Sequence, residues 1–368
     1  MKTIVLCVTL LPCFVAFTVI DTGKLSRRYQ FRTADTIIKA ESSLTSADIP
    51  TADQKSKVQR FYNNYEWTNA MSGQTYNINY RVEGDSSKPP IILVHGFGAN
   101  VNHFRYNFPL LVEAGYQVYA VDLLGFGGSD KPKDAEYSIE LWVNLLCEFM
   151  KDMSTSINSG ENDGEKWIVC GNSIGGLCSL GVTSKLKDLV KGCVLFNCAQ
   201  GMSAIRYEEL PWLLKPIVTF VQKVVLAPDG YGGKFFENFK TRENVESILR
   251  GQGVYGDTTN VDDELLEILL GPSEDDGAKE VFLKVFGGDA GPTPEEFLKD
   301  IEVPILALWG DSDPWVPVDR GTHQGLNFGQ YTKGEYILEI LEGVGHCPQD
   351  EVPSQIHEKM LPWLKSLP

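Results

Sequence analysis

The sequence has 368 residues, of which 43% are hydrophobic and 22% charged, a balance typical of a globular protein with one large core and an insertion. Its formal net charge at pH 7 is -16, and lysine and arginine form no cluster. Because phosphate binding needs such a cluster, the sequence argues against a nucleic-acid partner.

The first twenty residues have the shape of a signal peptide. Lys2 precedes an apolar run from Ile4 to Ile20 that is interrupted only by Thr9, Pro12 and Thr18. The run is at the low end of the length that spans a membrane, and it contains a proline. These features favour cleavage over membrane anchoring.

Residues 22 to 47 resemble a transit peptide, because five basic residues lie among serine and threonine while only Asp35 and Glu41 oppose them. The basic residues are Lys24, Arg27, Arg28, Arg32 and Lys39. A signal followed by such a segment, with Phe17 directly after Ala16, resembles the two-part plastid address of algae whose plastids lie inside the secretory system. We therefore predict that residues 1–48 are cleaved and that the protein reaches the plastid (chloroplast). Secretion or the endomembrane lumen is the alternative.

Six cysteines follow this leader, and five of them lie in or beside apolar segments: Cys147, Cys170, Cys178, Cys193 and Cys198. No C-x-x-C pair or small-domain framework is present, so we expect buried free thiols in a reducing compartment. The even number would also permit disulfides.

The core is predicted to begin near residue 50. Apolar residues alternate at Tyr76, Ile78, Tyr80 and Val82, which predicts an early antiparallel strand at the edge of the sheet. The continuous apolar run Pro90–Val94 predicts a central parallel strand, which ends in His95-Gly96-Phe97-Gly98. An open α/β sheet builds its site at such carboxyl ends. The backbone amide of Phe97 is therefore a candidate oxyanion donor, and His95 is predicted to brace the turn.

Two aspartates follow the next predicted strand, Gln117–Val121. Asp122 and Asp130 precede the candidate nucleophile, whereas in this class of fold the acid of a catalytic triad comes after it. We interpret both as loop and helix-cap residues. Residues 139 to 153 then form a long amphipathic pattern that predicts a helix.

Residues 166 to 176 contain a serine in the pattern G-x-S-x-G, directly after the strand-like run 167–170. This spacing predicts a sharp strand-to-helix turn that exposes Ser173 as a nucleophile and needs Gly171 and Gly175 for close packing. The turn also aims the amide of Ile174 at the position where an oxyanion would form. A glycine-rich turn without chemistry is the alternative.

After the sixth strand, Val194–Phe196, the strand pattern stops for about a hundred residues. We predict a core of residues 49–199 and 299–368 and a helical cap of residues 200–298 over the site. An apolar stripe in the cap is expected to form its core, or to line a pocket for a long hydrocarbon if part of it faces inward: Leu213, Ile217, Phe220, Val221 and Val224.

The strand pattern resumes at Pro304–Trp309, and two aspartates follow it. Asp313 is the predicted acid of the triad, while Asp311 is better placed to cap the turn. A last strand, Tyr336–Leu341, leads to His346, which occupies the place of the base in the order serine, acid, histidine. Together these features predict acyl transfer by Ser173, with no metal and no cofactor.

Five motifs, HGFG, DLLGFGGSDKP, GNSIGG, GDSDPWVP and GHCPQDEVP, give residues 60 to 368 a resemblance to the α/β-hydrolase superfamily. In particular they look like the pheophytinase and chlorophyll dephytylase branch of plants and algae. The resemblance implies an α/β-hydrolase fold, with a mostly parallel central sheet, helices on both faces and a helical cap after the sixth strand. It also implies Ser173, Asp313 and His346 as the triad and a phytyl ester of a chlorophyll-type pigment as the substrate.

Other functions share parts of this pattern. Epoxide hydrolases have motifs similar to the first two, but they use an aspartate nucleophile where this chain has a serine. Carbon-carbon bond hydrolases share the GNS-x-GG elbow. An esterase or lipase for another apolar substrate, or a ligand sensor without turnover, is also compatible. The expected partner is an apolar small-molecule ester, including a pigment at a membrane surface, and the oligomeric state is left open.

Overall fold

The computed structural model describes residues 6–11, 14–19, 58–157, 165–203, 205–208, 210, 212, 215–225, 227–319 and 323–368. The chain divides into two compact units, Met1–Lys57 and Val58–Pro368. In the first unit, β1 (Leu6–Leu11) pairs antiparallel with β2 (Phe14–Val19). The rest of the predicted leader lies outside the described residues, so its cleavage and address stay predictions.

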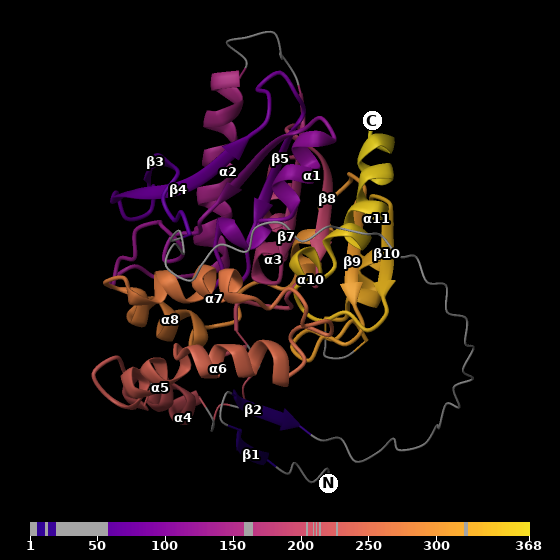
Figure 1. Cartoon of the computed structure of the whole chain (residues 1–368). Coiled ribbons are helices and arrows are strands. Elements are labelled where there is room, and N and C mark those ends of the chain that lie inside the picture. Colours follow the sequence, from indigo (N-terminus) through magenta and orange to yellow (C-terminus); the bar gives the residue numbers. More distant parts are fainter. Residues whose placement is uncertain are drawn as a thin grey trace, which may run out of the picture. The chain divides into compact units, whose positions relative to one another are not determined.

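The second unit is built on an eight-stranded sheet in the order β10-β9-β8-β7-β5-β6-β4-β3 (Figure 1). The six strands from β10 to β6 run parallel to one another, while β4 is antiparallel to both β6 and β3. The strands are β3 (Asn63–Thr68), β4 (Thr75–Glu83), β5 (Pro90–Val94), β6 (Gln117–Val121), β7 (Trp167–Asn172), β8 (Val190–Phe196), β9 (Ile305–Gly310) and β10 (Tyr336–Leu341). The predicted mostly parallel sheet is confirmed.

Both faces of the sheet are covered, which is why its central strands are apolar throughout. Ile92 and Val94 of β5 face one hydrophobic core, which also contains residues of α2 (Ile139–Ile157) and α3 (Ile174–Lys185). Ile91 and Leu93 face a second core with residues of η1 (Val101–Phe104), α1 (Asn107–Glu113) and α11 (Pro353–Ser366). The carboxyl ends of the parallel strands therefore come together at one edge of a layered core.

The segment between β8 and β9, residues 197–304, is an insertion whose described elements are all helical. They are α4 (Lys215–Phe220), η2 (Val221–Val225), α5 (Tyr231–Phe239), α6 (Arg242–Glu246), η3 (Ser247–Gly251), α7 (Asp263–Leu270), η4 (Gly271–Glu274), α8 (Ala278–Phe286) and α9 (Pro294–Leu298). In Figure 1, α4 to α8 lie at the end of the sheet toward which β9 and β10 point. The predicted helical insertion after the sixth strand is confirmed, and its boundaries of 200 and 298 stay predictions. The remaining helices are η5 (Gly325–Gln330) and α10 (Pro348–Glu351).

Two details differ from the predictions. The predicted edge strand, β4, is antiparallel but lies second from the edge, because the unpredicted β3 pairs with its outer side. The apolar stripe of the insertion is not all core: Phe220 and Val224 are 58% and 52% exposed. Both side chains therefore point to solvent and not into the core of the insertion. The side chains of Leu213 and Ile217 lie outside the described residues.

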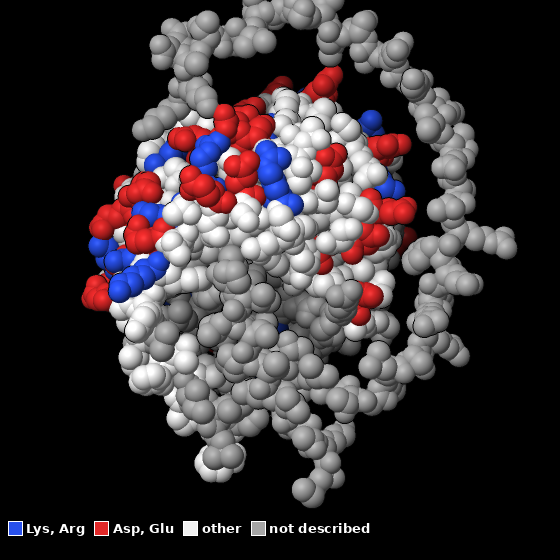
Figure 2. Space-filling view, turned by 60° about the horizontal axis from the view of Figure 1, so that its bottom comes forward, with Lys and Arg blue, Asp and Glu red and all other residues white. Residues whose placement is uncertain are grey.

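The six cysteines after the leader are buried free thiols, as predicted: Cys147, Cys170, Cys178, Cys193, Cys198 and Cys347. Within the described part of the chain, no helix is both long and apolar enough to cross a membrane. On the face shown in Figure 2, acidic and basic side chains are intermixed over one part of the surface, and much of the other described surface is uncharged.

Candidate active site

Ser173 lies at the junction of β7 and α3 in a strained backbone conformation, with φ 56° and ψ -124°. A residue with a side chain rarely adopts a positive φ, and such strain gathers at functional sites. The turn is tight because α3 packs directly on β5: a Cβ atom on Gly175 would collide with the carbonyl oxygen of Val94. The predicted nucleophile therefore stands at a sharp strand-to-helix turn.

The turn after β5 lies against this serine. A Cβ atom on Gly96 would lie 3.1 Å from the Cβ atom of Ser173, so Phe97 follows the point of contact directly. Ile174 is the first residue of α3, where an amide has no carbonyl of its own helix to bind. Among the described residues, no acceptor binds the amide of Phe97 or that of Ile174. The two predicted oxyanion donors are thus free to bind a ligand oxygen.

The predicted acid and base are in direct contact. Nδ1 of His346 donates to Oδ2 of Asp313 over 2.7 Å, and both residues are buried. The other carboxylate oxygen of Asp313 accepts from the amides of Trp315 and Val316, at 2.8 and 3.0 Å. Burial alone would raise the pKa of Asp313, but attraction to His346 and these hydrogen bonds outweigh it and lower the pKa below its ordinary value. The ionised acid holds the proton of His346 on Nδ1, which leaves Nε2 as an acceptor.

Asn172 joins the serine turn to the histidine loop. Its side-chain amide donates to the carbonyl oxygen of His346 over 3.0 Å and to that of Phe196 over 3.1 Å. Since Asn172 directly precedes Ser173, the nucleophile and the base are held on neighbouring backbone segments. The structure therefore brings the turns that carry Ser173, Asp313 and His346 together at the carboxyl ends of β7, β9 and β10.

Comparisons with known proteins identify the family. Residues 91–358 match the model of the alpha/beta hydrolase family. The chain belongs to this family.

Its relatives in the family differ in chemistry. The chain is 29% identical over 238 residues to a 2-hydroxy-6-oxo-6-(2'-aminophenyl)hexa-2,4-dienoic acid hydrolase of Metapseudomonas resinovorans, which covers 62% of this chain and 70% of the relative. It is 24% identical over 282 residues to Lipase 1 of Psychrobacter immobilis, covering 74% and 75%. A solved serine hydrolase involved in carbazole degradation has a similar fold, with a TM-score of 0.59, 23% identity and coverage of 82% and 99%.

A further candidate residue, which was not predicted from the sequence, is Asn197, directly after β8. Its side chain donates to Oδ2 of Asp313 over 2.7 Å and accepts from the amide of Gly310 over 3.0 Å. Its φ of 42° is a conformation that residues with a side chain rarely adopt. The only sequence signal was a polar residue at the carboxyl end of an apolar strand. The ring of Trp315 also contacts that of His346 edge-on, with 5.1 Å between centroids.

His95 braces the turn, as predicted. Its Nδ1 donates to the carbonyl oxygen of Gly96 over 2.8 Å, and its Nε2 accepts from the amide of Leu123 over 3.0 Å. Burial lowers the pKa of His95, so the ring is neutral, consistent with the one-donor, one-acceptor pattern. This residue fixes the position of the loop and does not face the acid of the site.

The other aspartates also have structural partners. Asp122 is fully buried and accepts from Asn79 and from the amides of Val101 and Gly128. Asp130 accepts from the amide of Asn77, so it fastens a loop to β4 and does not cap a helix. Asp311 accepts from the amide of Gly343 over 2.8 Å. Asp313, and not Asp311, is therefore the carboxylate beside His346.

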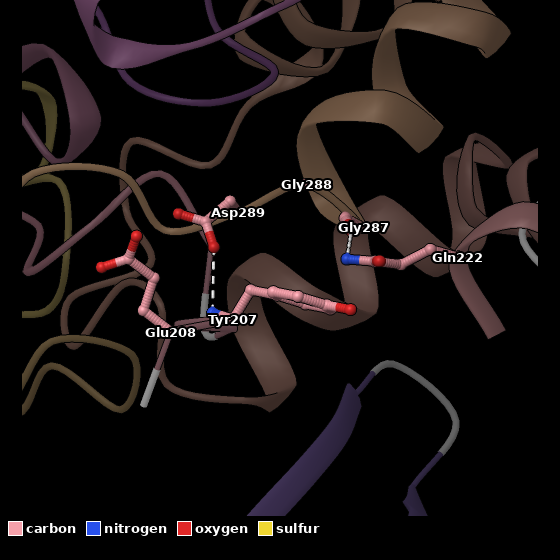
Figure 3. A pocket seen from close by; sticks show the side chains of 6 residues that line it. All are labelled: Tyr207, Glu208, Gln222, Gly287, Gly288 and Asp289. Carbon is pink, nitrogen blue, oxygen red and sulfur yellow. Dashed lines mark hydrogen bonds between the residues drawn. The ribbon is translucent and has the colours of Figure 1, made fainter. Parts of the chain in front are cut away.

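Two hollows lie on the surface of the second unit. One of about 460 Å³ lies in the insertion and is lined by Tyr207, Glu208, Gln222, Gly287, Gly288 and Asp289. Figure 3 shows some of these residues bound to one another: the amide of Tyr207 donates to Asp289, and Gln222 donates to the carbonyl of Gly287. The other, of about 500 Å³, is lined by Asp313 and neighbouring residues of its loop, among them Asp311 and Pro314. Ser173 lines neither of these two hollows.

Among the described residues, no acidic, histidine or cysteine side chains gather as a metal site.

Proposed function

We propose that this hydrolase cleaves carboxylic esters with Ser173 as nucleophile, His346 as base and Asp313 as acid. The observation that carries the proposal is the 2.7 Å hydrogen bond between Asp313 and His346, whose backbone is bound by Asn172, the residue before the serine of the strained elbow. A serine hydroxyl, an imidazole base and an ionised acid that orients this base are the parts that acyl transfer to serine requires.

In the proposed reaction, Nε2 of His346 accepts the proton of Ser173 while the hydroxyl oxygen attacks the acyl carbon. The amides of Phe97 and Ile174 hold the oxyanion, each contributing roughly 10² to 10³ in turnover, as oxyanion donors do elsewhere. His346 then gives the proton to the leaving alcohol. Water, activated by the same histidine, releases the acid and restores Ser173.

Incubation of the purified protein with pheophytin, chlorophyll and short p-nitrophenyl esters tests this proposal. We expect ester hydrolysis that Ser173→Ala abolishes and that Ser184→Ala, a matched change on the same helix, leaves intact. Absence of hydrolysis with all these esters, or an unchanged rate in Ser173→Ala, would contradict it. Tight ligand binding without product would instead favour a ligand sensor.

The proposed substrate is a phytyl ester of a chlorophyll-type pigment in the plastid. The motifs GDSDPWVP and GHCPQDEVP support it, together with the transit-like leader. The exposed Phe220 and Val224 lie on one face of the insertion and are compatible with uptake from an apolar phase such as a membrane surface. Chromatography of the products tests the bond and the substrate together, since free phytol must appear with its matching acid. A fluorescent fusion of residues 1–48 tests the address.

Carbon-carbon bond hydrolysis is the second candidate, because one relative is named as a hydrolase of a substituted hexadienoic acid. The same serine, acid and base are compatible with both reactions. Loss of the dienoate chromophore, with cleavage between two carbon atoms and no ester hydrolysis, would favour this candidate over the ester.

A further inference from the structure

The loop that carries His346 lies directly against residues 254–262 of the insertion, which we call the anchor segment. The amide of His346 donates to the carbonyl oxygen of Val254 over 2.7 Å. Gly256 leaves no space for a side chain, because a Cβ atom there would collide with the carbonyl oxygen of Gly343. Two backbone segments from distant parts of the chain are thus in contact at the proposed base.

A buried carboxylate spans this contact. Glu351, on α10, is 4% exposed. Its Oε1 accepts from the amide of Asp257 over 2.8 Å, and its Oε2 accepts from the amide of Gly345 over 2.9 Å. One side chain therefore binds both the anchor segment and the residue that precedes His346. Hydrogen bonds to an ionised acceptor are among the stronger ones in proteins.

The neighbouring Asp350 binds the anchor segment on both sides of Asp257. It is fully buried, and its carboxylate accepts from the hydroxyl of Tyr255 over 3.0 Å and from Nε of Arg105 over 2.9 Å. Asn260 donates to the carbonyl oxygen of Asp350 over 2.8 Å. The anchor segment is thus bound along its length to the helix that follows the histidine loop.

We propose that Glu351 is a positioning residue for His346, and that the anchor segment is a fixed part of the active site within an otherwise helical cap. Asp313 orients one end of the imidazole, while Glu351 and Val254 fix the backbone from which the ring projects. The ring and its backbone must both be held in place, because a displacement of about 1 Å at a catalytic group can lower turnover roughly 100-fold. This inference rests on the proposed function of His346.

Glu351→Gln tests the proposal, since it keeps the size of the side chain and replaces one accepting oxygen with a donor. We expect kcat to fall about tenfold, the effect of weakening one hydrogen bond to a charged group, with KM changed less than about twofold. The low-field proton resonance of His346 Nδ1–H should also shift or broaden. Glu302→Gln, at an exposed glutamate paired with Lys333, is the control and should change neither quantity.

A folded Glu351→Gln protein with unchanged kcat and an unchanged His346 resonance would overturn the proposal. If this variant does not fold, hydrogen exchange in the wild-type protein decides. The amides of Asp257, Gly345 and His346 should exchange as slowly as those of β5 and β7, and fast exchange would overturn the proposal. Both the resonance and the exchange are measured without substrate, so they separate failure of this inference from failure of the proposed ester hydrolysis.

Discussion

The ring of Phe282 packs against the ring of Phe97, with 5.1 Å between their centroids. Phe282 is on α8 of the insertion, whereas Phe97 supplies one of the proposed oxyanion amides. Phe236 and Phe239 surround Phe282 from α5, at 5.2 and 4.8 Å. The helical insertion therefore supports the oxyanion turn through an aromatic cluster.

Phe282→Ala should consequently reduce both stability and turnover. Loss of a buried phenylalanine lowers the free energy of unfolding by about 3 kcal/mol, and the freed ring of Phe97 lets the oxyanion amide move. The matched control is Phe286→Ala, since Phe286 stacks on Phe282 with 5.7 Å between their centroids, whereas Phe282 itself contacts the ring of Phe97. Chemical unfolding and kcat measure the two effects. Equal losses of kcat in both variants would contradict a specific role in the oxyanion turn.

Ser173→Gly should be more stable than Ser173→Ala, although both should lack ester hydrolysis. At φ 56° glycine is unstrained, whereas alanine keeps the strain of the native residue. We expect a difference of about 1 kcal/mol in the free energy of unfolding. Urea unfolding of the two variants measures it, and an alanine variant as stable as the glycine variant would show that the turn is not strained.

Asn197→Gly should lower kcat about tenfold with little change in KM. The change removes the donor to Asp313 and the acceptor for Gly310, and a hydrogen bond to a charged group contributes about 1.5 to 3 kcal/mol. Glycine suits the native φ of 42°, so the variant isolates the lost side-chain contacts from backbone strain. Steady-state kinetics with a p-nitrophenyl ester measure the change. Wild-type kcat in this variant would mean that Asp313 needs no support from β8.

The folded protein should lose stability as the pH falls from about 6.5 toward 4. Burial lowers the pKa of His103 and of His357 to about 4, and it also lowers that of His95. Below the ordinary histidine pKa, the unfolded chain therefore binds protons that the folded protein does not, which favours unfolding. Chemical unfolding at several pH values measures the slope. His357→Gln should make the slope shallower, and an equal slope in this variant would contradict the prediction.

The sequence was sufficient to single out Ser173, Asp313 and His346 as candidates, because each follows an apolar strand at a glycine-containing turn and the three occur in the expected order. It did not reveal Asn197, since a single polar residue after a strand has no distinctive spacing. Nor did it reveal Glu351, because its partner Asp257 is remote in the sequence and bonds through its backbone.

The periodicity of apolar residues shows which residues share a helix face but not what that face contacts. It groups Phe220 and Val224 on one face of a helix, but it does not say whether that face points to the core or to solvent. The edge strand β3 was missed for a similar reason: its residues are mostly polar or exposed, with Trp67 alone fully buried among them. Strand pairing, and not hydrophobicity, makes this segment a strand.

The contact between the anchor segment and the histidine loop changes the thermodynamics of the insertion. An insertion held only at its ends is one long loop, whereas a contact in its middle divides it into two shorter closures. The closure entropy of a loop rises slowly with length, by about 0.6 kcal/mol for each doubling. Once the anchor segment has docked, the helices on either side of it can therefore be lengthened or exchanged at small entropic cost. Changes in these helices can then alter which substrate is bound, while the backbone that carries the base stays in place.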